Sequence, residues 1–383
     1  MRKKFSKIDK LLLVSIIIFA IFGLIMVLSA SSMESYMRYD KSPYNYFFRH
    51  LIFVIAGLIA YFIMHFIPTK VYKKISNIFM IGIFAIMIGL IIYGQSTREA
   101  VSWFQIGPIS IQPSEFSKII VLLYLGYYYE KNNDNLSNQW VVIKPLIFIF
   151  ILCVLVALQP DLGTASIIAF ISLLIFYAVP IPKDTRKTFN KIFIGAIAIV
   201  IVLFISTKGT ILRDYQFKRL YSFIYNPCER YQDDEGYQLC NSYIAFYNGG
   251  VGGSGIGEST QKYLYLPDSY TDFIFPIVVE EWGMIVGMIV VLGYGFILYR
   301  IFKIARNAKN LGNGIIAYGV FTYILLHISI NLIGVMGLGP LTGVPLPFLS
   351  YGGSYTLSLF IALGIVQRIS IENNKDFSKK KLR

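Results

Sequence analysis

Two aspartates stand directly before long apolar segments of this chain, where a carboxylate could take a proton from a substrate hydroxyl. Asp161 precedes the apolar segment that begins at Leu162, and Asp272 precedes the one that begins at Phe273. A positioned carboxylate can serve as a general base, and an aspartate in this place is also a favoured helix cap. For each residue taken alone the two interpretations have equal weight, so the surrounding residues decide.

Two further acids lie within an apolar segment, where a capping role is excluded. Glu280 and Glu281 follow Asp272 by about two helical turns. Ionisable side chains inside a membrane segment are costly and indicate a functional site by default. The pair is therefore a candidate part of a substrate site near Asp272.

Cations that could bind an anionic substrate accompany these acids. Lys118 lies one turn beyond the Gln-Pro-Ser-Glu sequence at 112–115, and Lys262 follows Gln261. Three arginines complete the candidate set: Arg98 in the loop at 94–112, and Arg213 and Arg219 in the same long loop as Lys262. An anionic substrate would need such groups. The ordinary alternatives are a lysine that extends to the membrane interface and loop charges exposed to solvent.

Composition identifies the elements that must position these side chains. Of the 383 residues, 56% are apolar and only 15% are charged, whereas soluble domains are usually about 25% charged. A helix needs roughly 20 mostly apolar residues to cross the hydrocarbon core of a membrane. We therefore predict an all-α, polytopic integral membrane protein with about ten transmembrane helices, forming a single domain over 1–383.

Ten segments meet this requirement of length and hydropathy. They are Leu11–Ala30, Phe47–Ile67, Asn77–Tyr93, Pro113–Tyr129, Pro145–Gln159, Leu162–Pro180, Ile192–Thr207, Phe273–Tyr299, Asn313–Val335 and Tyr351–Ile371. The first is too long for the apolar part of a cleaved signal peptide, so it is predicted to remain as an anchor.

Charge gives the direction of insertion, because cytoplasmic segments of membrane proteins are rich in Lys and Arg. With the N-terminus in the cytoplasm, the segments on that side carry 24 basic residues and the opposite segments carry 8. Both termini are then cytoplasmic, including a short basic tail at 372–383. A large extracytoplasmic loop at 208–272 joins the seventh and eighth spans. The net charge of +14 is thus a topology signal, and no nucleic-acid partner is expected.

The unusual polar sequence collects on the extracytoplasmic side. Loop 94–112 contains Trp103, the fifth and sixth spans are joined at Asp161, and the loop at 336–350 leads into a Tyr-Gly-Gly-Ser sequence at 351–354. A transporter would place its polar groups near the midplane on interrupted helices of both halves. An outward-facing enzyme that acts on a lipid-linked substrate fits better, with a transporter as the alternative.

Glycines are concentrated at 249–257 in the large loop, and they include a G-x-G-x-x-G pattern at 250–255. This pattern binds dinucleotides only between a strand and a helix, and here it faces the wrong side of the membrane. We expect the glycines to allow a tight turn or a close approach of the backbone to a substrate. No nucleotide or organic cofactor is expected.

Cysteine and histidine are too few and too badly spaced for a structural zinc site. Cys228 and Cys240 share the large extracytoplasmic loop, so a disulfide between them is a hypothesis for this loop. Such a bond would stabilise the loop by on the order of 3 kcal/mol. Cys153 is predicted to be a small buried apolar residue.

Four motifs resemble the SEDS family (shape, elongation, division and sporulation), whose named types are FtsW, RodA and SpoVE. They are Gln-Pro-Asp-Leu-Gly-Thr at 159–164, Gln-Pro-Ser-Glu at 112–115, Leu-Pro at 266–267 followed by Thr-Asp-Phe-Ile-Phe at 271–275, and Pro-Leu-Pro-Phe-Leu-Ser-Tyr-Gly-Gly-Ser at 345–354. The resemblance implies a ten-span peptidoglycan glycosyltransferase of the bacterial cytoplasmic membrane. It would polymerise lipid II at the outer face together with a class B penicillin-binding protein.

The resemblance also assigns residues. It implies that Asp272 and Asp161 are the essential acids, and the positions that match the family's substrate-binding motifs are Trp103, Lys118, Gln261, Lys262, Glu280, Glu281, Ser350, Gly352 and Gly353. The chain departs from the family pattern at three positions. Ser102 stands where an Arg often precedes the Trp, Tyr270 replaces the usual His, and Asp268 replaces a Glu.

The reaction implied by this resemblance joins a sugar hydroxyl to the anomeric carbon of a second lipid-linked disaccharide. We expect Asp272 to be the base, and Asp161 to orient the acceptor or to help bind a divalent cation such as Mg²⁺ or Mn²⁺. The cations Lys118 and Lys262, with Arg98, Arg213 or Arg219, are expected to hold the pyrophosphate. A lipid II flippase and a noncatalytic scaffold for the penicillin-binding protein are the alternatives. The sequence leaves division, elongation and sporulation types open, with a slight preference for the FtsW and SpoVE types.

Overall fold

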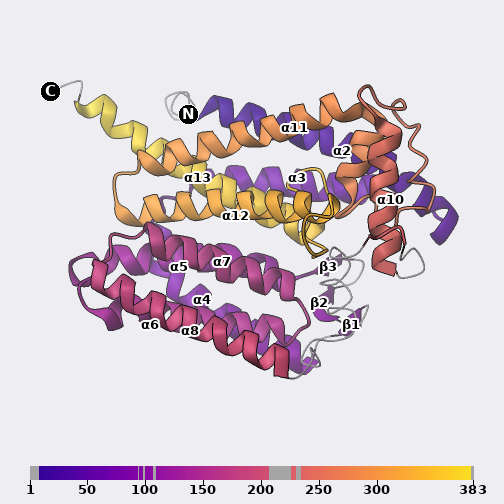
Figure 1. Cartoon of the computed structure of the whole chain (residues 1–383). Coiled ribbons are helices and arrows are strands. Elements are labelled where there is room, and N and C mark those ends of the chain that lie inside the picture. Colours follow the sequence, from indigo (N-terminus) through magenta and orange to yellow (C-terminus); the bar gives the residue numbers. More distant parts are fainter. Residues whose placement is uncertain are drawn as a thin grey trace.

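The long helices of the protein run side by side, and both chain termini lie at the same end of the bundle (Figure 1). The structure is a computed structural model, and it describes residues 8–93, 95–97, 100–106, 109–206, 226–229 and 234–380. Arg98, Arg213 and Arg219 lie outside the described residues.

Every predicted span corresponds to a helix. The ten helices are α2 (Lys10–Tyr39), α3 (Asn45–Phe66), α4 (Thr69–Tyr93), α5 (Pro113–Lys131), α6 (Gln139–Ala157), α7 (Leu162–Ala178), α8 (Lys183–Ser206), α11 (Ile274–Arg306), α12 (Leu311–Val335) and α13 (Gly353–Lys380). Within the described residues, seven helices are long and apolar enough to cross a membrane, and α7 is a shorter apolar helix. The prediction of an all-α, polytopic membrane protein is confirmed.

Polar side chains fix where several helices begin. Asp9 caps α2 by accepting a 3.0 Å hydrogen bond from the backbone nitrogen of Leu12, and Asn310 caps α12 in the same way through the nitrogen of Asn313. Such caps satisfy backbone donors that have no partner inside the helix. The helices then differ in burial: α13 is enclosed by its neighbours, whereas α3 exposes large apolar side chains such as Ile52 and Ile59.

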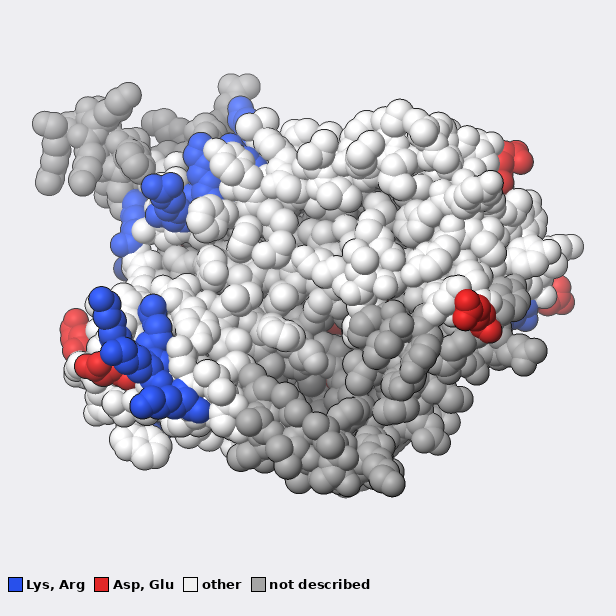
Figure 2. Space-filling model, in the orientation of Figure 1, with Lys and Arg blue, Asp and Glu red and all other residues white. Residues whose placement is uncertain are grey.

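Charged side chains separate along the bundle. Figure 2 shows Lys and Arg gathered at the end that carries both termini, with an uncharged surface beyond it and mainly Asp and Glu at the other end. This is the arrangement expected when basic loops remain in the cytoplasm. We refer to the end that carries the acids as the outer end.

Two elements at the outer end differ from the sequence prediction, which treated both segments as loops. The segment at 94–112 contains a three-stranded antiparallel sheet of β1 (Gln95–Thr97), β2 (Ala100–Ile106) and β3 (Ile109–Ile111). The large loop contains helix α10 (Asp234–Gly249). The central strand β2 is rich in β-branched and aromatic residues, including Val101, Trp103, Phe104 and Ile106, which favour strands.

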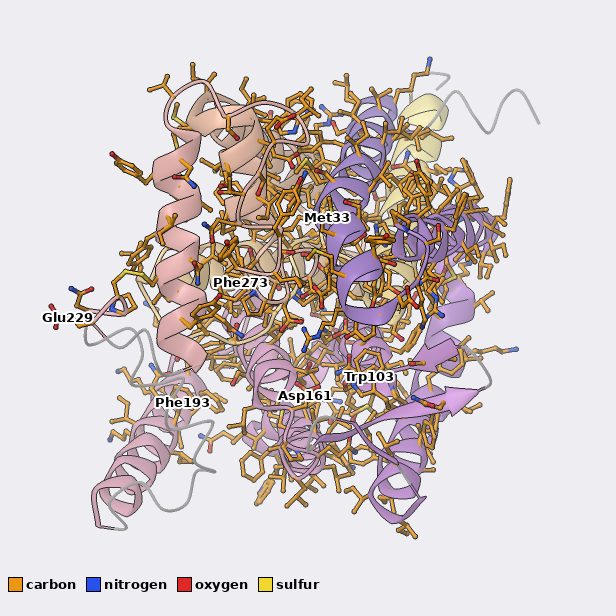
Figure 3. All side chains as sticks on the ribbon, turned by 90° about the vertical axis from the view of Figure 1, so that its right-hand side faces the viewer. Met33, Trp103, Asp161, Phe193, Glu229 and Phe273 are labelled. Carbon is orange, nitrogen blue, oxygen red and sulfur yellow. A yellow bond between two sulfur atoms is a disulfide. The ribbon has the colours of Figure 1, made fainter. Side chains whose placement is uncertain are left out.

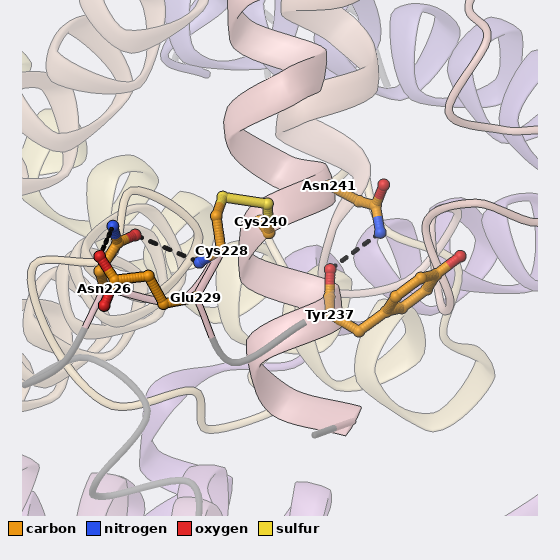
Figure 4. The surroundings of a disulfide bond; sticks show 6 residues. All are labelled: Asn226, Cys228, Glu229, Tyr237, Cys240 and Asn241. Carbon is orange, nitrogen blue, oxygen red and sulfur yellow. Dashed lines mark hydrogen bonds between the residues drawn. A yellow bond between two sulfur atoms is a disulfide. The ribbon is translucent and has the colours of Figure 1, made fainter. Parts of the chain in front are cut away.

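A disulfide joins Cys228 to Cys240, in agreement with the hypothesis from the sequence, with 4.9 Å between the two Cα atoms (Figure 4). In the short segment that carries Cys228, the side chain of Asn226 accepts a 3.2 Å hydrogen bond from the backbone nitrogen of Cys228. The bond ties this segment to α10, and Ser242 of α10 donates in turn to the carbonyl of Val335 at the end of α12. Cys153 is free and partly buried.

The eighth span, α11, is interrupted at Gly283, whose φ is 83°. The glycine-rich segment fills the break: the nitrogens of Ser254 and Gly255 donate to the carbonyls of Glu280 and Glu281 at 2.9 and 3.1 Å. Beyond the break, the nitrogen of Met284 donates to the carbonyl of Gly250 at 3.0 Å. The loop therefore supplies hydrogen bonds that the helix lacks.

This contact explains the glycines. A Cβ atom on Gly249 or Gly253 would overlap the carbonyl oxygen of Val279 or Glu281, and one on Gly283 would overlap that of Val251. The expectation of a tight turn and a close backbone approach is correct. The backbone that these glycines approach is that of α11, however. A substrate is not needed to explain why glycines stand at these positions.

Candidate active site at the outer end of the bundle

Asp161 joins two of the sequence motifs. Its Oδ1 accepts a 3.0 Å hydrogen bond from the nitrogen of Thr164 and caps α7. Its Oδ2 accepts from the side-chain nitrogen of Gln112 at 2.8 Å and from the hydroxyl of Ser114 at 3.2 Å. The helix-cap interpretation is therefore right, and the same carboxylate also holds the start of α5.

The Tyr-Gly-Gly-Ser motif reaches the same place. The backbone nitrogen of Gln112 donates a 2.9 Å hydrogen bond to the hydroxyl of Ser354, at the start of α13. The absence of a side chain at Gly353 allows the ring of Phe53 to pack against the start of α13, because a Cβ atom at this position would lie 2.5 Å from the ring. Ser350 braces the preceding turn, because its hydroxyl accepts from the nitrogen of Leu346 at 2.8 Å. Gly352 begins the first turn of α13, with its carbonyl accepting from the nitrogen of Thr356.

Asp272 is half-buried and lies just before α11. The hydroxyl of Thr271 donates to its Oδ1 at 2.9 Å, and the side-chain nitrogen of Asn331 donates to its backbone carbonyl at 2.7 Å. Figure 3 looks onto the outer end and shows Asp161, Trp103 and Phe273, the neighbour of Asp272, on this one end of the bundle. The predicted convergence of distant segments at one end is what the structure shows.

Three tyrosines cluster beside Asp272. The rings of Tyr46, Tyr270 and Tyr351 lie with centroids 4.7 to 5.7 Å apart, and the nitrogen of Tyr351 donates to the carbonyl of Tyr270 at 2.9 Å. Burial raises the pKa of Tyr270 well above its ordinary value, so its phenol stays neutral. This residue stands where the resembling family usually has a histidine. The position consequently carries no group that titrates near neutral pH.

Lys118 does not extend to the membrane interface. Its side chain is fully buried, its ammonium lies 2.8 Å from Glu115 and 3.1 Å from His327, and the rings of Tyr323 and Tyr355 flank it. An ammonium can only donate, so Nε2 of His327 accepts from it and Nδ1 of His327 carries the proton that goes to the carbonyl of Pro345. Lys118 therefore reaches a pyrophosphate only if this network rearranges.

Lys262 is buried as well. Its ammonium contacts Glu281 at 3.0 Å, the hydroxyl of Ser29 at 3.1 Å and the carbonyl of Gly257 at 2.5 Å. The pair links the large loop to α11 and α2. Glu281 thus has a partner for its charge inside the apolar segment, as buried ions require.

Glu280 organises the turn that precedes Lys262. Its carboxylate accepts from the hydroxyls of Ser259 and Thr260, from the side chain of Asn248 at 3.0 Å and from the backbone nitrogen of Gln261 at 3.3 Å. The side-chain oxygen of Gln261 is buried without a hydrogen-bond partner among the described residues. Glu280 and Glu281 both hold this loop, and the structure gives them no contact with Asp272.

Trp103 lies on β2 opposite Gln95 of β1, and its side chain is half-buried. The sheet follows α4 and leads directly into Gln112 and α5, which places Trp103 near the segment bound by Asp161. The structure thus brings Gln112, Asp161 and Ser354 together and places Lys118 and Lys262 in separate buried ion pairs.

The sequence matches a family described as cell cycle proteins of the FtsW, RodA and SpoVE types over residues 9–375. This match covers almost the whole chain. The protein belongs to the SEDS family.

Similar proteins agree with this membership. The chain is 35% identical over 387 residues to a probable peptidoglycan glycosyltransferase FtsW of Bacillus subtilis, a match that covers all of this chain and 95% of the relative. Its fold is similar to a chain of a solved peptidoglycan synthase complex, with a TM-score of 0.74, 21% identity and coverage of 96% and 99% of the two chains. It is also similar to Thermus thermophilus rod shape determining protein RodA, with a TM-score of 0.66, 21% identity and coverage of 96% and 98%.

The sequence reasoning missed two side chains that hold this SEDS site together, His327 and Asn331. Both are polar residues inside the apolar α12, and they are four residues apart, so they lie on one face of that helix. Buried polar side chains in an apolar span are a signal for contacts with other polar groups, and this signal was present in the sequence.

Among the described residues, no group of three His, Cys, Asp or Glu side chains could hold a metal ion. Mg²⁺ is often bound by one or two carboxylates together with substrate phosphates. The carboxylate of Asp161 fits a site of this kind, in which substrate phosphates complete the coordination. Gln112, Ser114 and Thr164 already donate hydrogen bonds to its two oxygens.

Proposed function

We propose that this SEDS protein is a peptidoglycan glycosyltransferase that polymerises lipid II at the outer face of the bacterial cytoplasmic membrane. The observation that carries the proposal is the meeting of the motifs at the outer end. Asp161 binds Gln112, Gln112 binds Ser354, and Asn331 binds the backbone of Asp272. A flippase would need polar groups near the midplane, whereas this constellation lies at one end of the bundle.

In this proposal Asp272 accepts the proton from the attacking sugar hydroxyl. Its carboxylate is half-buried and already orders one hydroxyl, that of Thr271, at 2.9 Å. The sugar oxygen then forms a bond to the anomeric carbon of the second disaccharide, and the bond from that carbon to the pyrophosphate oxygen breaks. A positioned base typically contributes 10²–10⁴-fold to such a rate.

The leaving pyrophosphate needs positive charge near it. Asp161 would help to hold a divalent cation such as Mg²⁺ or Mn²⁺, and that cation would supply part of the positive charge when bound. Arg98, Arg213 and Arg219 remain predicted contributors. Lys262 contributes by holding the large loop to α11, and Lys118 contributes by joining α5 to α12, unless substrate binding separates them from Glu281 and Glu115.

A class B penicillin-binding protein is the proposed partner, because a polymerase of glycan strands requires a crosslinking enzyme beside it. The similarity of the fold to a chain of a peptidoglycan synthase complex supports such an assembly.

The deciding experiment is glycan synthesis by the purified protein with its partner and lipid II, with the products separated by length. Wild-type protein is expected to form polymer and Asp272→Asn to lose it. Asp40→Asn is the matched control, since Asp40 is an exposed acid at the same end with a left-handed backbone that Asn tolerates. Polymer from Asp272→Asn at the wild-type rate would overturn the assignment of the base.

Two further assays separate the flippase and the scaffold from the polymerase. A flippase would move fluorescent lipid II across a liposome membrane and produce no glycan with any variant. A noncatalytic scaffold would restore growth to cells depleted of the wild-type protein even when it carries both Asp161→Asn and Asp272→Asn. Polymer that depends on Asp272 excludes both.

A further inference from the structure

Asn331 lies near the outer end of α12 and is almost completely buried. Its side-chain nitrogen donates two hydrogen bonds, to the backbone carbonyl of Asp272 at 2.7 Å and to that of Val344 at 2.8 Å. An amide nitrogen carries two hydrogens, so both donors of Asn331 are used. One side chain thus connects the backbone of the proposed base to the loop at 336–350.

The orientation of this amide is fixed by its surroundings. The opposite orientation would place Oδ1 against two carbonyl oxygens, which can only accept hydrogen bonds. In the observed orientation Oδ1 of Asn331 is buried without a partner among the described residues. A buried acceptor without a donor is unfavourable. The unfavourable burial of Oδ1 therefore accompanies the two hydrogen bonds that the amide nitrogen donates.

The loop that Asn331 binds is itself held firmly. His327, one turn earlier on α12, donates from Nδ1 to the carbonyl of Pro345 at 3.2 Å. The hydroxyl of Tyr294 on α11 donates to the carbonyl of Pro347 at 2.5 Å. Side chains from two helices therefore bind three carbonyls within four residues of this loop.

The same loop touches the surroundings of the second aspartate. A Cβ on Gly163, two residues after Asp161, would lie 3.1 Å from the carbonyl oxygen of Thr342 and 3.6 Å from the side chain of Val344. The loop is thus in contact both with the start of α7, which Asp161 caps, and through Asn331 with Asp272.

We propose that Asn331 is a positioning residue for the transfer reaction: its amide fixes the backbone of Asp272 against residues 342–347, and so sets the place of the base relative to Asp161. The inference rests on the proposed function of Asp272. Asn331 has no described contact with the Asp272 carboxylate, so it acts through the backbone. Misplacing a catalytic group by about 1 Å can cost about 10²-fold in rate.

The test replaces Asn331 by Leu, which is branched at the same carbon, is somewhat larger, and removes both donors. Asn313→Leu is the matched control, because Asn313 is a buried asparagine on the same helix whose side-chain nitrogen also has two acceptors, Thr69 and Glu372, at the opposite end. In polymerisation of lipid II, Asn331→Leu is expected to lower kcat by about 10²-fold with KM unchanged. Asn313→Leu is expected to keep the wild-type kcat.

A second measurement does not depend on activity. Hydrogen exchange of the backbone amides at 271–273 and of Gly343, Val344 and Leu346 is expected to rise in Asn331→Leu and to stay unchanged in Asn313→Leu. If Asn331→Leu does not fold, Asn331→Gln replaces it. That variant retains the amide, displaces it by one methylene, and is expected to show the same loss of kcat.

The outcomes separate this inference from the proposed function. If Asp272→Asn abolishes polymer while folded Asn331→Leu and Asn331→Gln retain the wild-type kcat, the inference is wrong and the base assignment stands. Equal losses in Asn331→Leu and Asn313→Leu would also overturn it, since they indicate general destabilisation. If Asp272→Asn is fully active, the proposed function fails, and the exchange data alone decide whether Asn331 fixes the two segments.

Discussion

Gln112 donates a hydrogen bond of 2.8 Å from its side-chain nitrogen to Oδ2 of Asp161. The two residues are 49 positions apart in the chain, and each belongs to a different motif. Their contact fixes the end of the small sheet, the start of α5 and the start of α7 relative to one another. Asp161 therefore has a structural role as a cap and a proposed chemical role, and the two can be separated by substitution.

Asp161→Asn and Asp161→Ala are expected to differ in stability and to agree in activity. Asn caps helices about as well as Asp, and Gln112 can turn its amide oxygen toward the new Nδ2, so the first variant loses less free energy of unfolding than the second, which loses about 1 kcal/mol from the cap alone. Without the carboxylate both should lose polymerisation by 10²-fold or more. Asn310→Ala, which removes the cap of α12 at the other end, should lose stability alone. Full activity of Asp161→Asn would reduce Asp161 to a helix cap.

Glu281→Gln is expected to destabilise the protein strongly. The ammonium of Lys262 is buried 3.0 Å from Glu281, and removing one partner of such a pair costs about 3–5 kcal/mol. Unfolding of the detergent-solubilised protein measures the loss. Glu258→Gln removes an exposed acid of the same loop and should change little. The double variant Lys262→Met, Glu281→Leu removes both charges and should recover most of the stability, and a loss as large as that of the single variant would contradict the ion-pair explanation.

Gly253→Ala is expected to destabilise the docking of the glycine-rich segment on α11. Gly253 has a φ of 83°, and a Cβ there would overlap the carbonyl of Glu281. A strained backbone of this kind costs about 1–3 kcal/mol, before any steric overlap is counted. Gly252→Ala, one residue earlier, meets no atom within 4 Å and should lie within about 0.5 kcal/mol of wild type. Equal stability of the two variants would mean that the segment does not dock in this way.

Counting thiols tests the disulfide. The unfolded protein should expose one reactive thiol, that of Cys153, before reduction and three afterwards. The variant Cys228→Ser, Cys240→Ser should lose up to about 3 kcal/mol of stability, because it releases a short closed loop. Three thiols in the unreduced protein would show that the bond is absent.

Labelling of single cysteines tests the direction of insertion. Tyr247→Cys lies on the exposed surface of α10 at the outer end, and Lys187→Cys is exposed at the end that carries the termini. A maleimide that cannot cross membranes is expected to label the first in intact cells and the second only after lysis. The reverse pattern would contradict the proposed location of the site.

The sequence alone was sufficient for the spans and for the convergence of the motifs, because both follow from hydropathy and from the charge of the loops. It was not sufficient to predict which side chains from distant parts of the chain contact one another. Lys262 and Glu281 are 19 positions apart in irregular and helical segments, and no periodicity relates them. Lys118 is different, since Glu115 stands three residues earlier on the same helix, and this spacing already predicts a pair.

The two elements missed at the outer end have ordinary physical reasons. Helix α10 is 16 residues long and half of its residues are polar or glycine, so a search for long apolar segments does not find it. The strands of the small sheet are only three to seven residues long, too short for a periodic pattern to distinguish them from a loop.

The break in α11 at Gly283 sets the order in which the chain can be assembled. Residues 249–257 are synthesised before α11, yet their nitrogens and carbonyls complete the hydrogen bonds of that helix. A membrane span with unpaired backbone groups is unfavourable in lipid. With the proposed topology, in which the large loop is extracytoplasmic, α11 would reach its final conformation only after this loop has crossed the membrane and folded back onto it. Translocation of the large loop would then be a precondition for the native eighth span.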